Sequence, residues 1–183
     1  RDDRTRDQES ALTNTPIQAQ VAAGGFSTAK SMEQKVALHH GEAKLRVTAT
    51  GIYSGKPGDT FLLLNAPAVL TSFEGAGLNL TRGAAEGGNP AYLVTIAGAT
   101  IPAAPEVELT ATFSYEVPAP DPSAGIVLPT GPAAFARIEA RHDRAGWEFQ
   151  SDRAVRTSPL DGAGANESAA VLLIAPGATA TLT

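Results

Sequence analysis

The sequence contains no cysteine and a single tryptophan, and aromatic residues make up 5% of its 183 residues. Without cysteine, the chain forms no disulfide, no thiolate metal site and no cysteine nucleophile. With so few aromatic rings, small and β-branched side chains must cover most of the core. Alanine alone contributes 34 residues. The few large side chains are therefore expected to anchor the core.

Excess positive charge and long apolar runs are lacking as well. The net charge is −5 and the isoelectric point is near 5.2, so the chain has no basic surface for nucleic acid or an anionic membrane. No apolar stretch approaches the roughly 18–20 residues that span a bilayer, and no signal peptide is recognisable. We therefore expect no nucleic-acid binding and no membrane insertion within this segment.

The first fifteen residues show no hydrophobic periodicity, and a charged flexible tail is predicted over residues 1–15. Seven of the first ten residues are charged, and the sequence does not begin with Met. A dense charged stretch commonly follows a removed signal peptide or a membrane helix. These features predict an extracytoplasmic bacterial protein, in the periplasm or at the cell surface, anchored through a segment outside this sequence.

Alternation of apolar and polar residues is the dominant pattern from Pro16 onward. The clearest case runs from Val107 to Val117, where apolar residues occupy every second position. Such alternation predicts a strand with one buried and one wet face, as antiparallel sheets contain. Further strands are expected at Ile17–Ala22, Phe61–Leu64, Val69–Glu74, Leu78–Arg82, Tyr92–Ala97, Phe135–Ala140, Trp147–Ser151 and Ala169–Ile174.

A β-hairpin is predicted near the start of the alternating region. Apolar residues alternate over Lys35–His40 and again over Ala43–Ala49, and only Gly41 and Glu42 separate the two runs. Glycine at the first central position suits a type II′ turn. The one candidate helix, Ser27–Lys35, is short and lacks a sustained helical period.

Many short strands separated by glycine and proline predict an all-β fold with little or no helix. We expect an antiparallel β-sandwich of immunoglobulin-like character. The stretch Pro118–Ser123 is a stiff extended connection, interpreted as a crossover within a single domain over residues 16–183. The alternative is a main sandwich over 16–117 and a smaller β subdomain over 124–183.

No group of residues predicts a catalytic, metal or cofactor site. His39 and His40 are adjacent near a strand end, so their side chains point to opposite faces, and His142 lies in a polar loop. Ser27 and Lys30 match the Ser-x-x-Lys spacing of penicillin-binding enzymes, but the partner motifs of that family are missing. We therefore predict that the chain is not an enzyme and holds no cofactor.

The aromatic residues Trp147 and Phe149 carry the remaining functional signal. They stand two positions apart on a predicted strand and project from one face. An exposed pair of this kind stacks on sugar rings, which gives the alternative hypothesis of a carbohydrate-binding module. We favour a core position for the tryptophan. The sequence thus predicts a non-catalytic module with a structural or protein-interaction role, and a protein partner, within a larger bacterial envelope protein.

Overall fold

The chain folds into β-strands joined by turns and loops. The structure is a computed structural model, and it describes residues 25–119, 125–176 and 180–183. In chain order the elements are β1 (Ala29–Leu38), β2 (Lys44–Gly55), β3 (Thr60–Asn65), β4 (Val69–Glu74), β5 (Leu78–Ala84), the 3-10 turn η1 (Glu86–Gly88), β6 (Pro90–Ile96), β7 (Val107–Pro118), β8 (Ile126–Leu128), β9 (Ala133–His142), β10 (Ala154–Pro159), β11 (Ser168–Ile174) and β12 (Ala180–Leu182). The all-β prediction is confirmed.

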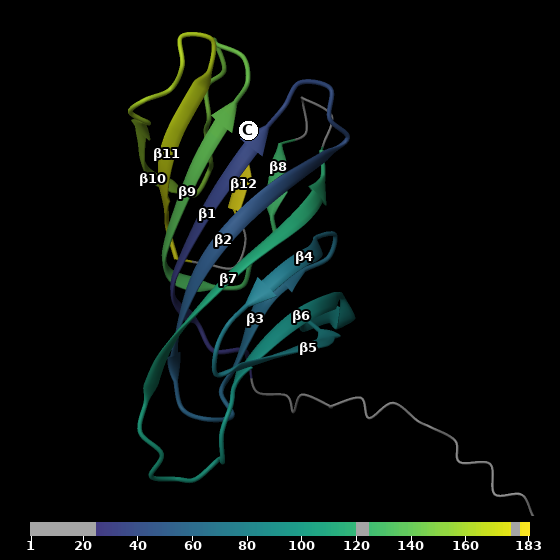
Figure 1. Cartoon of the computed structure of the whole chain (residues 1–183), viewed down its shortest axis with the longest axis vertical. Helices are drawn as coiled ribbons and strands as arrows, with labels where there is room; N and C mark the ends of the chain where they lie inside the picture. Colours follow the sequence, from purple (N-terminus) through teal and green to yellow (C-terminus); the bar gives the residue numbers. More distant parts are fainter. Residues whose placement is uncertain (1–24, 120–124, 177–179) are drawn as a thin grey trace, which may run out of the picture.

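The strands form one large sheet and two small ones. The large sheet has the order β10-β11-β9-β1-β2-β7-β4, and the small sheets have the orders β3-β6-β5 and β12-β8. In Figure 1 the small β12-β8 sheet lies toward the upper end of the large sheet and β3-β6-β5 toward its lower end. One buried cluster joins residues of all three sheets, so the two small sheets cover one face of the large one. The architecture is therefore sandwich-like.

One pair of strands departs from the predicted antiparallel pattern. β1 lies parallel to β9, with Met32 opposite Ala136, whereas the other strand pairs of the three sheets are antiparallel. The large sheet is mixed because the chain adds β9 beside β1 only after it has built the strands from β2 to β8. The immunoglobulin-like character stays a prediction.

The central strands of the large sheet show the alternation that the sequence predicts. On β7, Ala111, Phe113, Tyr115 and Val117 are buried, and the polar residues between them, Thr112, Ser114 and Glu116, are exposed or half-buried. The Phe113 and Tyr115 rings stack at a centroid distance of 6.2 Å. Burying one such side chain stabilises a fold by about 1.5–3 kcal/mol, so β7 supplies a large share of the core.

A polar group lies within this apolar core. Gln34 of β1 is only 3% exposed. Its side-chain oxygen accepts a hydrogen bond from the Tyr115 hydroxyl, and its amide donates to Thr130 Oγ1 at 3.3 Å. Burial raises the pKa of the Tyr115 phenol far above its ordinary value, so the hydroxyl stays protonated and donates. Gln34 thereby links β1 and β7 to the segment that follows β8.

The predicted hairpin is formed by β1 and β2, but its turn differs from the prediction. The Glu42 N–H donates to the His39 carbonyl at 3.3 Å, so the turn spans His39–Glu42. Gly41 is at the third position of this turn and has a positive φ of 82°. A positive φ at the third position is typical of a type II turn. The predicted type II′ turn, with Gly41 at the first central position, is therefore wrong.

Other sequence predictions are corrected in the same way. The candidate helix Ser27–Lys35 is wrong, because most of it is β1, whose Met32 and Gln34 alternate into the core. Trp147–Ser151 is not a strand but an irregular segment. Three predictions concern residues outside the described ranges. They are the tail over residues 1–15, the strand Ile17–Ala22 and residues 120–123 of the Pro118–Ser123 connection.

Membrane insertion was not expected from the sequence. Within the described part of the chain, no helix is both long enough and apolar enough to cross a bilayer. The extracytoplasmic location and the division into domains stay predictions.

Candidate functional site

An apolar cavity of about 430 Å³ opens at one end of the sandwich. This is the end that carries the β1–β2 turn, uppermost in Figure 1. The cavity is lined by Leu38, His39, His40, Gly41, Glu42, Leu45, Ala119, Gly125, Ile126, His142, Trp147, Glu148, Phe149, Leu182 and Thr183.

The inner wall of the cavity consists of apolar side chains from strand ends. Leu45 begins the inward alternation of β2, Ile126 begins β8, and Leu182 lies on β12; each is at most 9% exposed. Near the opening the chain carries small residues, among them Gly41 and Ala119. Among the residues that the structure describes, no large side chain covers the core at this end of the sandwich, which leaves the hollow.

A stacked pair of rings forms another part of the wall. The rings of His142 and Trp147 lie nearly parallel, at an angle of 17° and a centroid distance of 4.3 Å. His142, at the end of β9, is 5% exposed, and its Nδ1 accepts the Arg144 N–H at 3.0 Å. In the neutral ring the proton is therefore on Nε2. In this tautomer the Nε2–H of His142 can donate a hydrogen bond, because the contact with the Arg144 N–H uses only Nδ1.

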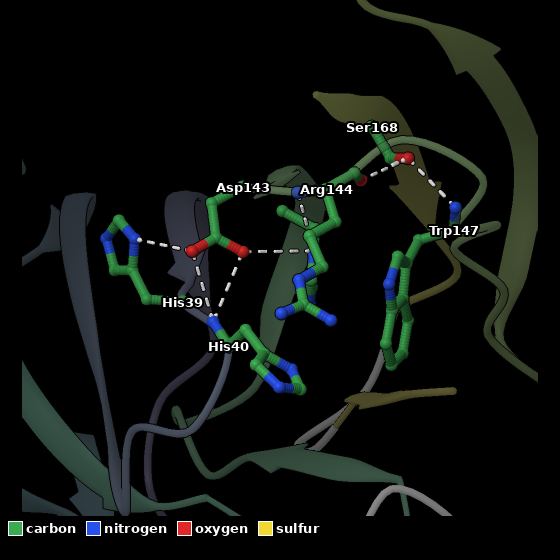
Figure 2. A network of polar contacts seen from close by, with 7 residues as sticks. His39, His40, Asp143, Arg144, Trp147 and Ser168 are labelled. Carbon is green, nitrogen blue, oxygen red and sulfur yellow. Dashed lines mark hydrogen bonds and ion pairs between the residues drawn. The ribbon is translucent and has the colours of Figure 1, made fainter. Parts of the chain in front are cut away.

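Ser168 holds the segment that presents the tryptophan. Its Oγ accepts the Trp147 N–H at 2.9 Å and donates to the Arg144 carbonyl at 2.8 Å. Figure 2 shows Ser168 between these two backbone groups, with the indole of Trp147 pointing away from them. Because Ser168 begins β11, the loop after β9 is fixed to the large sheet.

Asp143 fixes the β1–β2 turn beside the cavity. Both carboxylate oxygens accept the His40 N–H at 3.2 Å, and the carboxylate lies 3.6 Å from His39 Nδ1 (Figure 2). The Asp143 N–H in turn donates to the Leu38 carbonyl. Desolvation alone would raise the pKa of Asp143. The hydrogen bond from the His40 N–H and the coulombic attraction of His142 and His39 in their protonated form and of Arg144 outweigh it, so the pKa lies below its ordinary value of 3.8.

We expect Asp143→Asn to destabilise the protein at neutral pH and to have little effect in acid. A carboxyl group whose pKa is lower in the folded than in the unfolded protein stabilises the fold above the unfolded pKa. This contribution is lost as the pH falls through the lowered folded pKa of Asp143, below 3.8. Urea unfolding of both proteins at neutral pH and at about pH 3 measures the difference.

The matched control for this experiment is Asp161→Asn, which neutralises an exposed carboxylate in the loop after β10. Its free energy of unfolding should follow that of the unsubstituted protein at both pH values. An Asp143→Asn deficit of equal size at neutral and acid pH would contradict the assigned role of the carboxylate.

The histidine, aspartate and serine of this region do not form a nucleophilic triad. In such a triad the aspartate accepts from the N–H of one ring nitrogen, and the serine donates to the other nitrogen. Here His142 Nδ1 is an acceptor of the Arg144 N–H, and the Ser168 hydroxyl donates to a backbone carbonyl. The three side chains support the loop and the turn.

The histidines lie differently from what the sequence predicts. His39 and His40 were expected on opposite faces of a strand, and His142 in a polar loop. Instead His39 and His40 lie in a turn, His142 ends β9, and all three line the cavity. Over residues 25–119, 125–176 and 180–183, no three histidine, aspartate or glutamate side chains are grouped to hold a metal ion.

The aromatic pair is not an exposed sugar-binding platform. Trp147 is 45% exposed, but Phe149 is only 6% exposed and belongs to the core. The segment is irregular, so residues two apart do not share a face. The carbohydrate-binding alternative needed both rings in solvent and is wrong. Both residues do line the cavity, and with Glu148 they also line a neighbouring hollow of about 240 Å³.

Sequence comparison finds no relative: no protein-family model and no curated protein matches the chain. Structural comparison finds the M1 zinc metallopeptidase of Deinococcus radiodurans, with a TM-score of 0.47 and 12% identity. A mutant of the same enzyme matches with a TM-score of 0.48 and 10% identity. In both cases the match covers 85% of this chain and 41% of the metallopeptidase chain.

These comparisons correct the function predicted from the sequence. Both of these solved structures are metallopeptidases, whereas the sequence predicted a structural or protein-interaction module of an envelope protein. The chain spans less than half of their length. At this level of similarity, neither zinc binding nor peptidase activity carries over to this chain.

Proposed function

We propose that this chain is a non-catalytic β-sandwich module that binds a small molecule with an apolar body. The observation that carries the proposal is the cavity of about 430 Å³ at the end of the sandwich. Ligand sites are typically hollows of about 300–1,000 Å³ with mostly apolar walls and a few polar groups. Leu45, Ile126, Phe149 and Leu182 provide such walls, and the His142–Trp147 pair provides a flat aromatic surface.

The arrangement of the polar groups supports binding rather than catalysis. A catalytic site needs a nucleophile or a base within hydrogen-bond reach of a reacting atom. The Ser168 hydroxyl and the Asp143 carboxylate hold the backbone of Trp147 and His40, respectively, in place. Their hydrogen bonds shape the cavity wall.

Tryptophan fluorescence measures binding directly, because Trp147 is the only tryptophan of the chain and lines the cavity. We expect phenylbutanol, a neutral probe with an apolar body, to change the emission of Trp147 in a saturable manner. Ala119→Phe places a ring in the cavity and should abolish this change, because the new side chain occupies the space that the probe requires.

Ala37→Phe is the matched control, since the same substitution there adds a ring to the exposed face of β1. This variant should bind the probe as the unsubstituted protein does. A probe titration without saturation, or binding that survives Ala119→Phe, would show that the cavity is not a ligand site.

A further inference from the structure

Among the described residues that line the cavity, those with a formal charge are all acidic. Among the described residues of its lining, Glu42 and Glu148 carry carboxylates, and there is no lysine or arginine. Both side chains are exposed, so their charges lie at the opening. Glu148 Oε1 accepts a hydrogen bond from the neutral Gln150 amide at 3.1 Å. Within the described residues neither carboxylate has an ion-pair partner, so both negative charges are uncompensated.

The other titratable groups nearby do not reverse this sign. His39, His40 and His142 line the cavity, and a neutral imidazole ring adds no charge to it. Asp143 and Arg144 are not part of the lining, and their charges are opposite. Counted over the described residues, the opening of the cavity is therefore net negative, while its inner wall is apolar.

We infer that the cavity selects an organic cation: a molecule whose apolar body ends in an amine. This inference rests on the proposed function and specifies its ligand class. The apolar body lies against Leu45, Ile126 and Leu182, and the ammonium group lies at the opening, near Glu42 and Glu148. An organic anion of the same shape meets two like charges at that position and binds more weakly.

Three probes that each carry a phenyl ring on a four-carbon chain test the inference: phenylbutylamine, phenylbutanol and phenylbutyrate. Titrations are followed by Trp147 fluorescence at low ionic strength. We expect the amine to bind about tenfold more tightly than the butyrate, with the alcohol between them. Because the two carboxylates are exposed to solvent, added salt should reduce this ratio toward unity.

Substitution of the two glutamates identifies the source of the preference. The double variant Glu42→Gln/Glu148→Gln should bind the three probes with nearly equal affinity and leave the affinity for phenylbutanol unchanged. Glu86→Gln removes an equal charge from η1, away from the cavity, and should retain the preference for the amine.

The outcomes separate this inference from the proposed function. Equal affinities for the three probes, or tighter binding of phenylbutyrate, would overturn the selection of a cation while the cavity remains a ligand site. Preference for the amine that survives the double substitution would also overturn it. If phenylbutanol does not bind at all, the proposed function itself fails.

Discussion

Gly131→Ala is expected to lower the free energy of unfolding by more than about 4 kcal/mol, a large part of the roughly 5–15 kcal/mol that stabilises an ordinary domain. A Cβ atom at Gly131 would lie 1.9 Å from the Leu62 carbonyl oxygen and 2.8 Å from the carbonyl carbon. Both contacts are with backbone atoms, which cannot rotate away as a side chain does. The Gly131 N–H also donates to the Leu63 carbonyl, so the two segments would have to separate. Urea unfolding followed by circular dichroism measures the loss.

The comparison variant is Gly146→Ala. Gly146 has a positive φ of 88° but nothing within 4 Å of an added Cβ atom. Its substitution strains the backbone without a clash and should cost about 1 kcal/mol. If Gly131→Ala is as stable as Gly146→Ala, the close approach of the Leu62 backbone does not explain why position 131 is glycine.

Gln34→Leu is expected to lower the free energy of unfolding by about 2–5 kcal/mol. Leucine preserves most of the buried volume but leaves the hydroxyls of Tyr115 and Thr130 without their partner. Each buried polar group that loses its hydrogen bond costs about 1–3 kcal/mol. Denaturant unfolding at neutral pH gives the value, since the Tyr115 phenol stays protonated there.

A double-mutant cycle isolates the hydrogen bond between the two side chains. Tyr115→Phe alone leaves the Gln34 oxygen without its donor and should also destabilise the protein. In Gln34→Leu/Tyr115→Phe no hydroxyl is stranded at position 115, so the double variant should be more stable than the sum of the single losses predicts. Additive losses would mean that Gln34 and Tyr115 do not act as a pair.

Strands with one buried and one solvent-exposed face could be predicted from the sequence, because the alternation of apolar and polar residues that marks them is local. β7 and β2 alternate between buried and exposed positions, and β4 was predicted with its observed bounds, Val69–Glu74. β10 was missed because it is an edge strand without a fully buried residue, and its residues therefore show no apolar alternation. The start of β1 was misinterpreted because small and polar residues there are compatible with a short helix.

The cavity could not be predicted, since its lining combines segments that are distant in the sequence. The cavity wall brings together side chains from β1 and from the β12-β8 sheet, which lie at the same end of the sandwich. Examples are Leu38, Ile126 and Leu182. A local signal did exist at one point. His142 and Trp147 are close in the sequence, but the single tryptophan was predicted to lie in the core, whereas Trp147 is 45% exposed and lines the cavity.

The parallel pairing of β1 with β9 has a consequence for how the protein is made. β1 is the first described strand, yet its neighbour on one side, β9, follows β8 and most of the other strands in the chain. Pairings between such distant residues close slowly, so we expect refolding in milliseconds to seconds and not in microseconds. During synthesis the β1–β2 hairpin leaves the ribosome early. The edge of β1 that pairs with β9 stays unpaired until β9 has been made. A chain that terminates before β9 keeps that edge free to pair with other copies, and such truncated products should aggregate.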